Sequence, residues 1–153
     1  MIKELLLKKG WAGKTITRAE TAERLNPILR EHILLNREYD HAIRNHPDHS
    51  AREALGESQK VARADAGKIA ETIYSCGGVA YTGVELDPDD ARLAIGNTDL
   101  LDALEEFESA FGELVGAEKH VEHQMRTRAI LGVVLASSET RVGLLRELQR
   151  GAR

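Results

Sequence analysis

The sequence predicts an all-helical protein, an antiparallel four-helix bundle preceded by a short N-terminal helix. The composition is 42% hydrophobic and 30% charged, with 4% aromatic residues and three prolines, which favours helices over strands. Apolar residues recur at alternating spacings of three and four, which places them on one helix face. Helix start and stop signals divide the chain into four long segments, and a long connection follows the second.

One folded domain accounts for most of the chain. The 153 residues are an ordinary length for a single domain. Residues 1–16 are predicted to be a short amphipathic segment, with a helix that ends near Gly10. Residues 17–153 are predicted to form the four-helix domain.

The first long helix is predicted over 17–45. Thr17 and Glu20 have the spacing of a capping box, in which each side chain satisfies a free backbone donor of the other. Pro27 lies inside this segment and is expected to kink it. The inner row of this helix contains two polar residues: Leu25, Leu29, His32, Asn36, Tyr39 and Ile43.

The second long helix is predicted to begin at Ser50, which forms a capping box with Glu53, and to run to about Cys76. Gly77 and Gly78 then supply the left-handed backbone that helix ends favour. Its inner row contains small residues and one acid: Leu55, Ser58, Ala62, Asp65, Ile69, Thr72 and Cys76.

The last two helices follow the long connection "VAYTGVELDPDDARLAIGN". Thr98 is the predicted N-cap of the third helix. Helical periodicity then continues almost unbroken from 98 to 150, which as one helix would be about 80 Å long, too long for this domain. A break is therefore required, and Gly116 is the predicted position.

Part of the pattern resembles a known superfamily. The stretch "LNPILREHILLNREYDHAI", followed by "DAGKIAETIYSCGG", is similar to ferritin-like proteins, nearest to the small bacterial branch classed as a domain of unknown function. The matching positions are Leu25, Asn26, Tyr39, Cys76, Gly77 and Gly78. The resemblance implies ferritin-like connectivity, with a long loop between helices two and three, and a function connected with stress.

In that superfamily one helix of each pair carries a metal-binding glutamate and the other carries Glu-x-x-His. Here neither the second nor the last predicted helix has Glu-x-x-His, and Arg141 lies near the expected histidine. We therefore expect a degenerate site without a cofactor. Its residues form a buried polar cluster that fixes helix register: His32, Asn36, Asp65 and Glu108.

An atypical metal site is the alternative interpretation. It would make the protein an iron- or zinc-binding member of the superfamily or an oxidoreductase. Its ligands would come from Glu31, His32, Asp65, Glu108, Glu118 and His120. Within "EKHVEHQ", His120 and His123 are three residues apart, but two ligands make only a weak site, and a solvated helix start is the simpler interpretation.

Other function classes find little support. The net charge of −4 is evenly scattered, which argues against a nucleic-acid partner, and no window is apolar enough to span a membrane. One cysteine, Cys76, suits a reducing, cytoplasmic setting and is expected to be a small buried residue rather than a nucleophile. We expect a structural or interaction protein, without assigned catalytic residues, that forms a homodimer.

Overall fold

The computed structural model describes residues 15–84, 86 and 99–151. This part of the chain folds into four helices, α2 (Arg18–Asn45), α3 (His49–Ser75), α4 (Leu100–Glu118) and α5 (Met125–Gly151). No strand occurs among these residues, so the predicted all-helical class is confirmed for them. The expected helix in residues 1–16 lies outside the described part of the chain.

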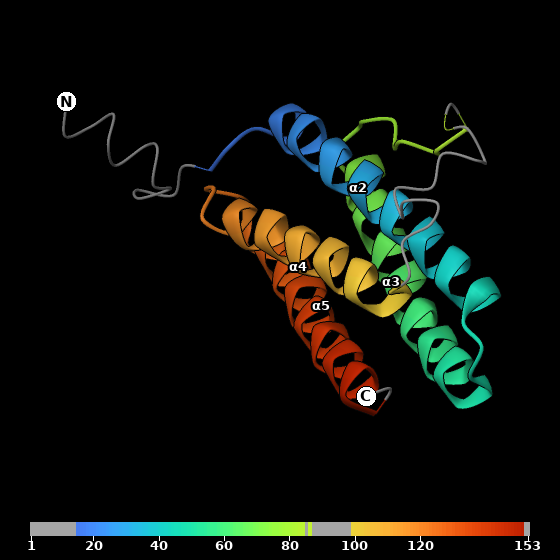
Figure 1. Cartoon of the computed structure of the whole chain (residues 1–153). Coiled ribbons are helices and arrows are strands. Elements are labelled where there is room, and N and C mark those ends of the chain that lie inside the picture. The colour runs from blue at the N-terminus through green and yellow to red at the C-terminus, as the bar shows by residue number, and fades with distance from the viewer. Residues whose placement is uncertain (1–14, 85, 87–98, 152–153) are drawn as a thin grey trace.

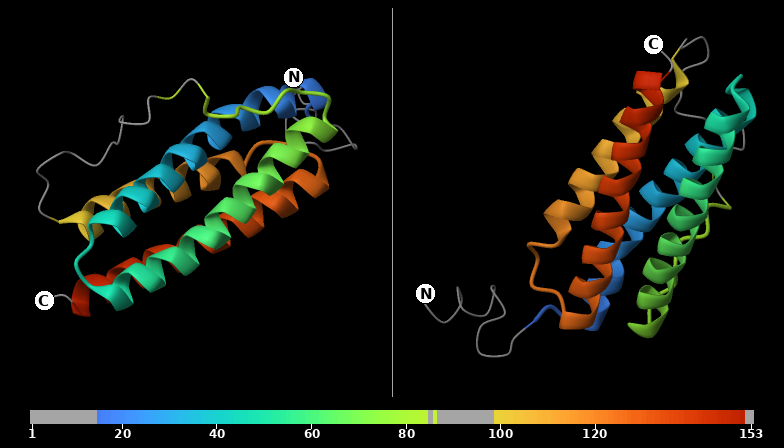
Figure 2. Two further views of the ribbon diagram at one scale, coloured as in Figure 1. Left: turned by 90° about the vertical axis from the view of Figure 1, so that its right-hand side faces the viewer. Right: turned by 90° about the horizontal axis from the view of Figure 1, so that it is seen from below.

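The helices pack as two pairs. α2 lies along α3 and α4 lies along α5, and the pairs meet where α2 contacts α4 and α3 contacts α5. The chain reverses direction at the turn after α2 and again at the turn after α4 (Figure 1). Both views of Figure 2 show the two helices of each pair side by side. Each helix therefore faces two neighbours, and the four inner faces share one interior.

The interior is mainly aliphatic. Fully buried side chains come from every helix: Leu25, Leu29, Leu55, Ile69, Leu104, Leu131 and Leu145. On α4 the buried row has spacings of three and four and includes Glu108, between Leu104 and Phe111. No helix in the described residues is long and apolar enough to cross a membrane. The position of Glu108 in an apolar row brings a carboxylate into the core.

The predicted cap of α2 is confirmed, whereas the predicted cap of α3 was wrong. α2 begins as predicted, with the Glu20 amide donating to Thr17 Oγ1 at 3.1 Å. The cap predicted at Ser50 was wrong, because the Asp48 carboxylate accepts from the Ala51 amide at 2.9 Å and α3 already starts at His49. Aspartate is as good an N-cap as serine, so either position fitted the local sequence.

Helix α4 also begins with an aspartate. The Asp99 carboxylate accepts from the Asp102 amide at 3.0 Å, so Asp99 is the N-cap. This corrects the predicted cap at Thr98, which lies outside the described residues. Thr98 and Asp99 are adjacent and both can cap, so the sequence could not separate them.

The end of α3 matches the Gly-Gly signal. Gly77 has a φ of 81°, a conformation that a side chain would strain. Gly78 is needed for a different reason, since a Cβ there would lie 2.5 Å from the Cβ of Ala22. The following segment is held on α2 by Asn26, whose side chain donates to the Val79 carbonyl at 3.0 Å and accepts from the Tyr81 amide at 2.8 Å.

The break between the last two helices lies later than predicted. α4 continues through Gly116 to Glu118, and residues 119–124 form the turn before α5. A contact from a distant segment holds this turn, because the Ile16 amide donates to the Glu122 carbonyl at 2.9 Å. The predicted break at Gly116 was wrong because a single glycine only weakens a helix.

Candidate functional site

Glu108 is the centre of a buried polar cluster. Its carboxylate is fully buried and accepts a hydrogen bond from Tyr39 Oη on α2 at 2.7 Å. From α5, Ser138 Oγ donates to it at 2.8 Å and Arg141 Nη2 at 3.2 Å, while Arg141 Nε bonds the other oxygen. Ser138 and Arg141 are three residues apart, so they share one face of α5. Side chains of α2 and α5 thus meet on one carboxylate of α4.

Asp65 brings α3 into the same cluster. It is 1% exposed, and its Oδ1 accepts from Lys68 Nζ at 3.1 Å. Its Oδ2 lies 4.0 Å from Arg141 Nη1, an ion pair without a hydrogen bond. Neither Oδ2 of Asp65 nor Nη1 of Arg141 has a hydrogen-bond partner. The guanidinium of Arg141 therefore lies between a carboxylate of α3 and a carboxylate of α4.

The cluster keeps its donors protonated. Burial works against the charge of Arg141, but the hydrogen bond to Glu108 and the negative charge of that carboxylate outweigh it and raise the pKa of the guanidinium. Burial, together with the charge of Glu108, also raises the pKa of the Tyr39 hydroxyl. Tyr39 is therefore a hydrogen-bond donor at any physiological pH, and Arg141 is a permanent cation.

His32 is buried beside the cluster without joining its hydrogen bonds. Its ring stacks on Phe111, with centroids 4.4 Å apart and planes inclined by 29°. Both ring nitrogens are buried and lack a hydrogen-bond partner. Burial, and secondly the charge of Arg141, lower the pKa of His32 to about 3. The imidazole is therefore neutral at pH 7.

Asn36 is only half-buried. Its side-chain amide donates to the His32 carbonyl one turn earlier, at 3.0 Å, and its Oδ1 has no partner. From α3, Gln59 donates to the Asn36 carbonyl at 3.1 Å and to Asp40 Oδ1 at 2.6 Å. Asn36 therefore lies on the α2–α3 contact, and its hydrogen bonds do not reach Glu108 or Asp65.

The other proposed metal ligands lie in different surroundings. Glu118, at the end of α4, accepts a hydrogen bond from Arg24 Nε at 2.7 Å, and its carboxylate lies 2.7 Å from His123 Nε2. His123 is buried, whereas His120 is exposed. Glu31 is half-buried and pairs with Arg30 at 3.3 Å. In the described part of the chain, no three His, Cys, Asp or Glu side chains form a group that could hold a metal ion.

Tyr39, Ser138 and Arg141 belong to this cluster but were not predicted as members, whereas Asp65 and Glu108 were. A signal for the α5 residues exists, because Ser138 and Arg141 interrupt a buried row whose apolar members are Leu131, Val134 and Leu145. Their polarity at core spacing marks two buried hydrogen-bonding groups. Polar residues at buried positions of two facing helices are therefore candidates to contact one another.

One Glu-x-x-His spacing does occur in the chain, at Glu38 and His41. It lies on α2, whereas the resemblance places this motif on the second and last long helices. Glu38 is 1% exposed and lines a groove between α2 and α4. The His41 ring lies 3.5 Å from the side chain of Asn45. The two residues are not members of the cluster around Glu108.

The cluster does not fit a divalent ion bound at Glu108. Both carboxylate oxygens of Glu108 are hydrogen-bonded to Arg141, and the same guanidinium faces Asp65. A metal at this position would have to displace a buried cation from its counter-ion.

Comparisons with protein-family models, with curated proteins and with solved structures find no match to this chain. What the chain does must therefore be inferred from its own side chains.

Proposed function

We propose that this protein is a ferritin-like helical bundle with a structural or interaction role, in which an internal arginine replaces the metal centre that the resemblance implies. The observation that carries this proposal is the contact of Arg141 with both oxygens of Glu108 in the interior. Buried carboxylates need a compensating charge, and here a side chain of the protein supplies it. The cluster then acts as a fixed connection among helices.

The path of the chain supports ferritin-like connectivity. α3 ends near the beginning of α2, whereas α4 begins near the end of α2, in Figures 1 and 2. The end of α3 and the beginning of α4 therefore lie at opposite ends of the bundle. A pair of antiparallel helices, a long crossover and a second pair is the arrangement of ferritin-like bundles.

Elemental analysis tests the proposal. The protein is purified without a histidine tag, incubated separately with excess iron(II) and zinc, and desalted. We expect less than one equivalent of either metal to remain in the native chain. Near-stoichiometric iron that the His32→Ala variant loses would overturn the proposal. The parallel control is His49→Ala, since His49 is an exposed histidine at the start of α3 and is not part of the cluster.

One observation favours an alternative, an atypical iron- or zinc-binding protein or an oxidoreductase. The ring nitrogens of His32 and Oδ2 of Asp65 are buried atoms of metal-ligating type that lack hydrogen-bond partners. Under this alternative, metal binding would need Arg141 to move away. The native chain would then bind metal more weakly than Arg141→Ala, which the same elemental analysis measures.

We also propose that the protein is a homodimer. Val61 of α3 and Val133 of α5 are 46% and 47% exposed, and they line two grooves between these helices. These side chains would be covered if α3 and α5 of one chain packed against a second copy. Light scattering at several concentrations should give the mass of two chains, and Val133→Asp should shift the mass toward one chain. A single-chain mass at every concentration would contradict the proposal.

A further inference from the structure

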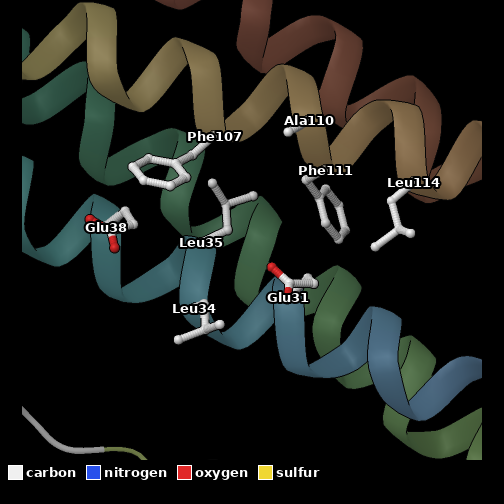
Figure 3. A pocket seen from close by; sticks show the side chains of 8 residues that line it. All are labelled: Glu31, Leu34, Leu35, Glu38, Phe107, Ala110, Phe111 and Leu114. Atoms are coloured by element: carbon white, nitrogen blue, oxygen red, sulfur yellow. The ribbon is translucent and has the colours of Figure 1, made fainter. Parts of the chain in front are cut away.

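A mainly apolar groove lies between α2 and α4, and we call it the α2–α4 groove. Phe107, Phe111 and Leu114 of α4 line it together with Leu35 of α2, and it encloses about 290 Å³. Figure 3 shows these side chains projecting into the space between the two helices. Leu114 is 38% exposed, so the apolar lining reaches the surface.

The surroundings of the groove are acidic. Glu31 and Glu38 of α2 line it, and Figure 3 shows their carboxylates on the α2 side of the space. Glu106 is exposed and directly precedes the lining residue Phe107. An apolar floor with acidic edges fits an amphipathic segment that carries leucines on one face and lysines beside them.

The chain contains a segment of matching composition. Residues 1–10, "MIKELLLKKG", hold three consecutive leucines together with Lys3, Lys8 and Lys9 and only one acid, Glu4. Its charge is opposite to that of the groove, and its apolar content matches the groove floor. The sequence also predicts an amphipathic helix here, which is the form that binds grooves between helices.

The segment is attached close to the groove. The Ile16 amide donates to the Glu122 carbonyl at 2.9 Å, which anchors the chain beside the turn that follows α4. Leu114 lies four residues before the end of α4, a rise of about 6 Å, and Phe107 lies about 10 Å further along. Residues 11–15 can extend about 17 Å, and a helix of ten residues is about 15 Å long. Reach and length therefore both match.

We propose that residues 1–10 bind in the α2–α4 groove of their own chain, with leucines on Phe107, Phe111 and Leu114 and lysines toward the surrounding glutamates. A short tether gives the segment an effective concentration in the millimolar range, so even a weak contact is occupied. The groove would then be an intramolecular docking site for this segment. This proposal is independent of the function proposed above.

Paramagnetic broadening in the full-length chain tests the docking. Cys76→Ser removes the native thiol, and Glu106→Cys carries a nitroxide label at the edge of the groove. We expect the amide signals of residues 2–9 to lose intensity. A label at Glu57→Cys, an exposed position on α3, is the control and should leave these signals intact.

Variants make the test specific. Leu114→Asp should restore the signals, whereas Val61→Asp, at a comparably exposed position on α3, should not. Lys8→Glu combined with Lys9→Glu should weaken the broadening without altering the four helices, which circular dichroism would verify. Unbroadened signals beside the Glu106 label would overturn the proposal. Broadening found only between isotope-labelled and spin-labelled copies would also overturn it and assign the groove to a second chain.

Discussion

Arg141 and Glu108 are 33 residues apart in the sequence, yet the guanidinium of one bonds both carboxylate oxygens of the other. Their side chains are 2% and 0% exposed. An ion pair buried in this way stabilises little relative to an apolar pair, but it is costly to break, because the remaining partner stays charged in the core. The contact therefore joins α4 to α5 inside the core.

Removing one partner of this pair should destabilise the fold strongly. For Arg141→Ala we expect a loss of about 3–5 kcal/mol in the free energy of unfolding, because Glu108 would remain buried without its cation. Urea unfolding monitored by circular dichroism measures the loss. The matched control is Arg146→Ala on the same helix, whose pair with Glu105 is exposed and should contribute at most about 1 kcal/mol. Equal losses in the two variants would contradict the assigned role of Arg141.

Replacing the buried histidine should change how stability depends on pH. The pKa of His32 is about 3 in the folded chain, against 6.5 when it is exposed. Between these values the unfolded chain binds more protons, so native stability falls as pH decreases from 6.5 toward 3. His32→Phe removes this dependence and keeps a ring against Phe111. The quantity to compare is the free energy of unfolding of His32→Phe minus that of the native protein. We expect this difference to be more positive at about pH 4.5 than at about pH 7.5, by on the order of 2–3 kcal/mol.

Unfolding curves at the two pH values measure this gain. The exposed His49 provides the control, and His49→Gln should show a much smaller change over the same interval. A difference between native and His32→Phe proteins that does not vary with pH would mean that His32 is not held neutral by burial.

Gly78 lies so close to α2 that we expect no side chain to be tolerated at this position. In Gly78→Ala the new Cβ would lie 2.5 Å from the Cβ of Ala22, so the end of α3 or the start of α2 must move. We expect a cost of about 1–3 kcal/mol. Gly67→Ala is the control inside α3, where no atom lies within 4 Å, and it should stabilise by up to about 1 kcal/mol. Thermal unfolding would show the opposite signs, and a neutral Gly78→Ala would refute the contact.

The start of α3 provides a direct comparison of two caps. Asp48→Ala removes the acceptor of the Ala51 amide and should cost about 1 kcal/mol. Ser50→Ala, which would be the damaging change if Ser50 were the cap, should have almost no effect. The two free energies of unfolding, measured side by side, decide which residue begins the helix.

Local sequence determined the helices, because periodicity and helix ends depend on neighbours within a few residues. The capping of α2 by Thr17 and the end of α3 at Gly77 both follow from such short-range chemistry. The same periodicity placed His32 and Asp65 on inner rows, where the structure buries them. The break after α4 was misplaced because a single glycine, Gly116, does not end the helix, and a distant residue, Ile16, contacts the turn that follows Glu118.

Only the tertiary structure decided which inner polar groups meet. The sequence grouped His32 with Asp65 and Glu108, but the fold pairs Glu108 with Tyr39, Ser138 and Arg141 and leaves His32 stacked on Phe111. These contacts depend on the rotation and offset of one helix against another, which no local pattern contains. The α2–α4 groove is likewise a product of packing, because each helix contributes only one of its walls.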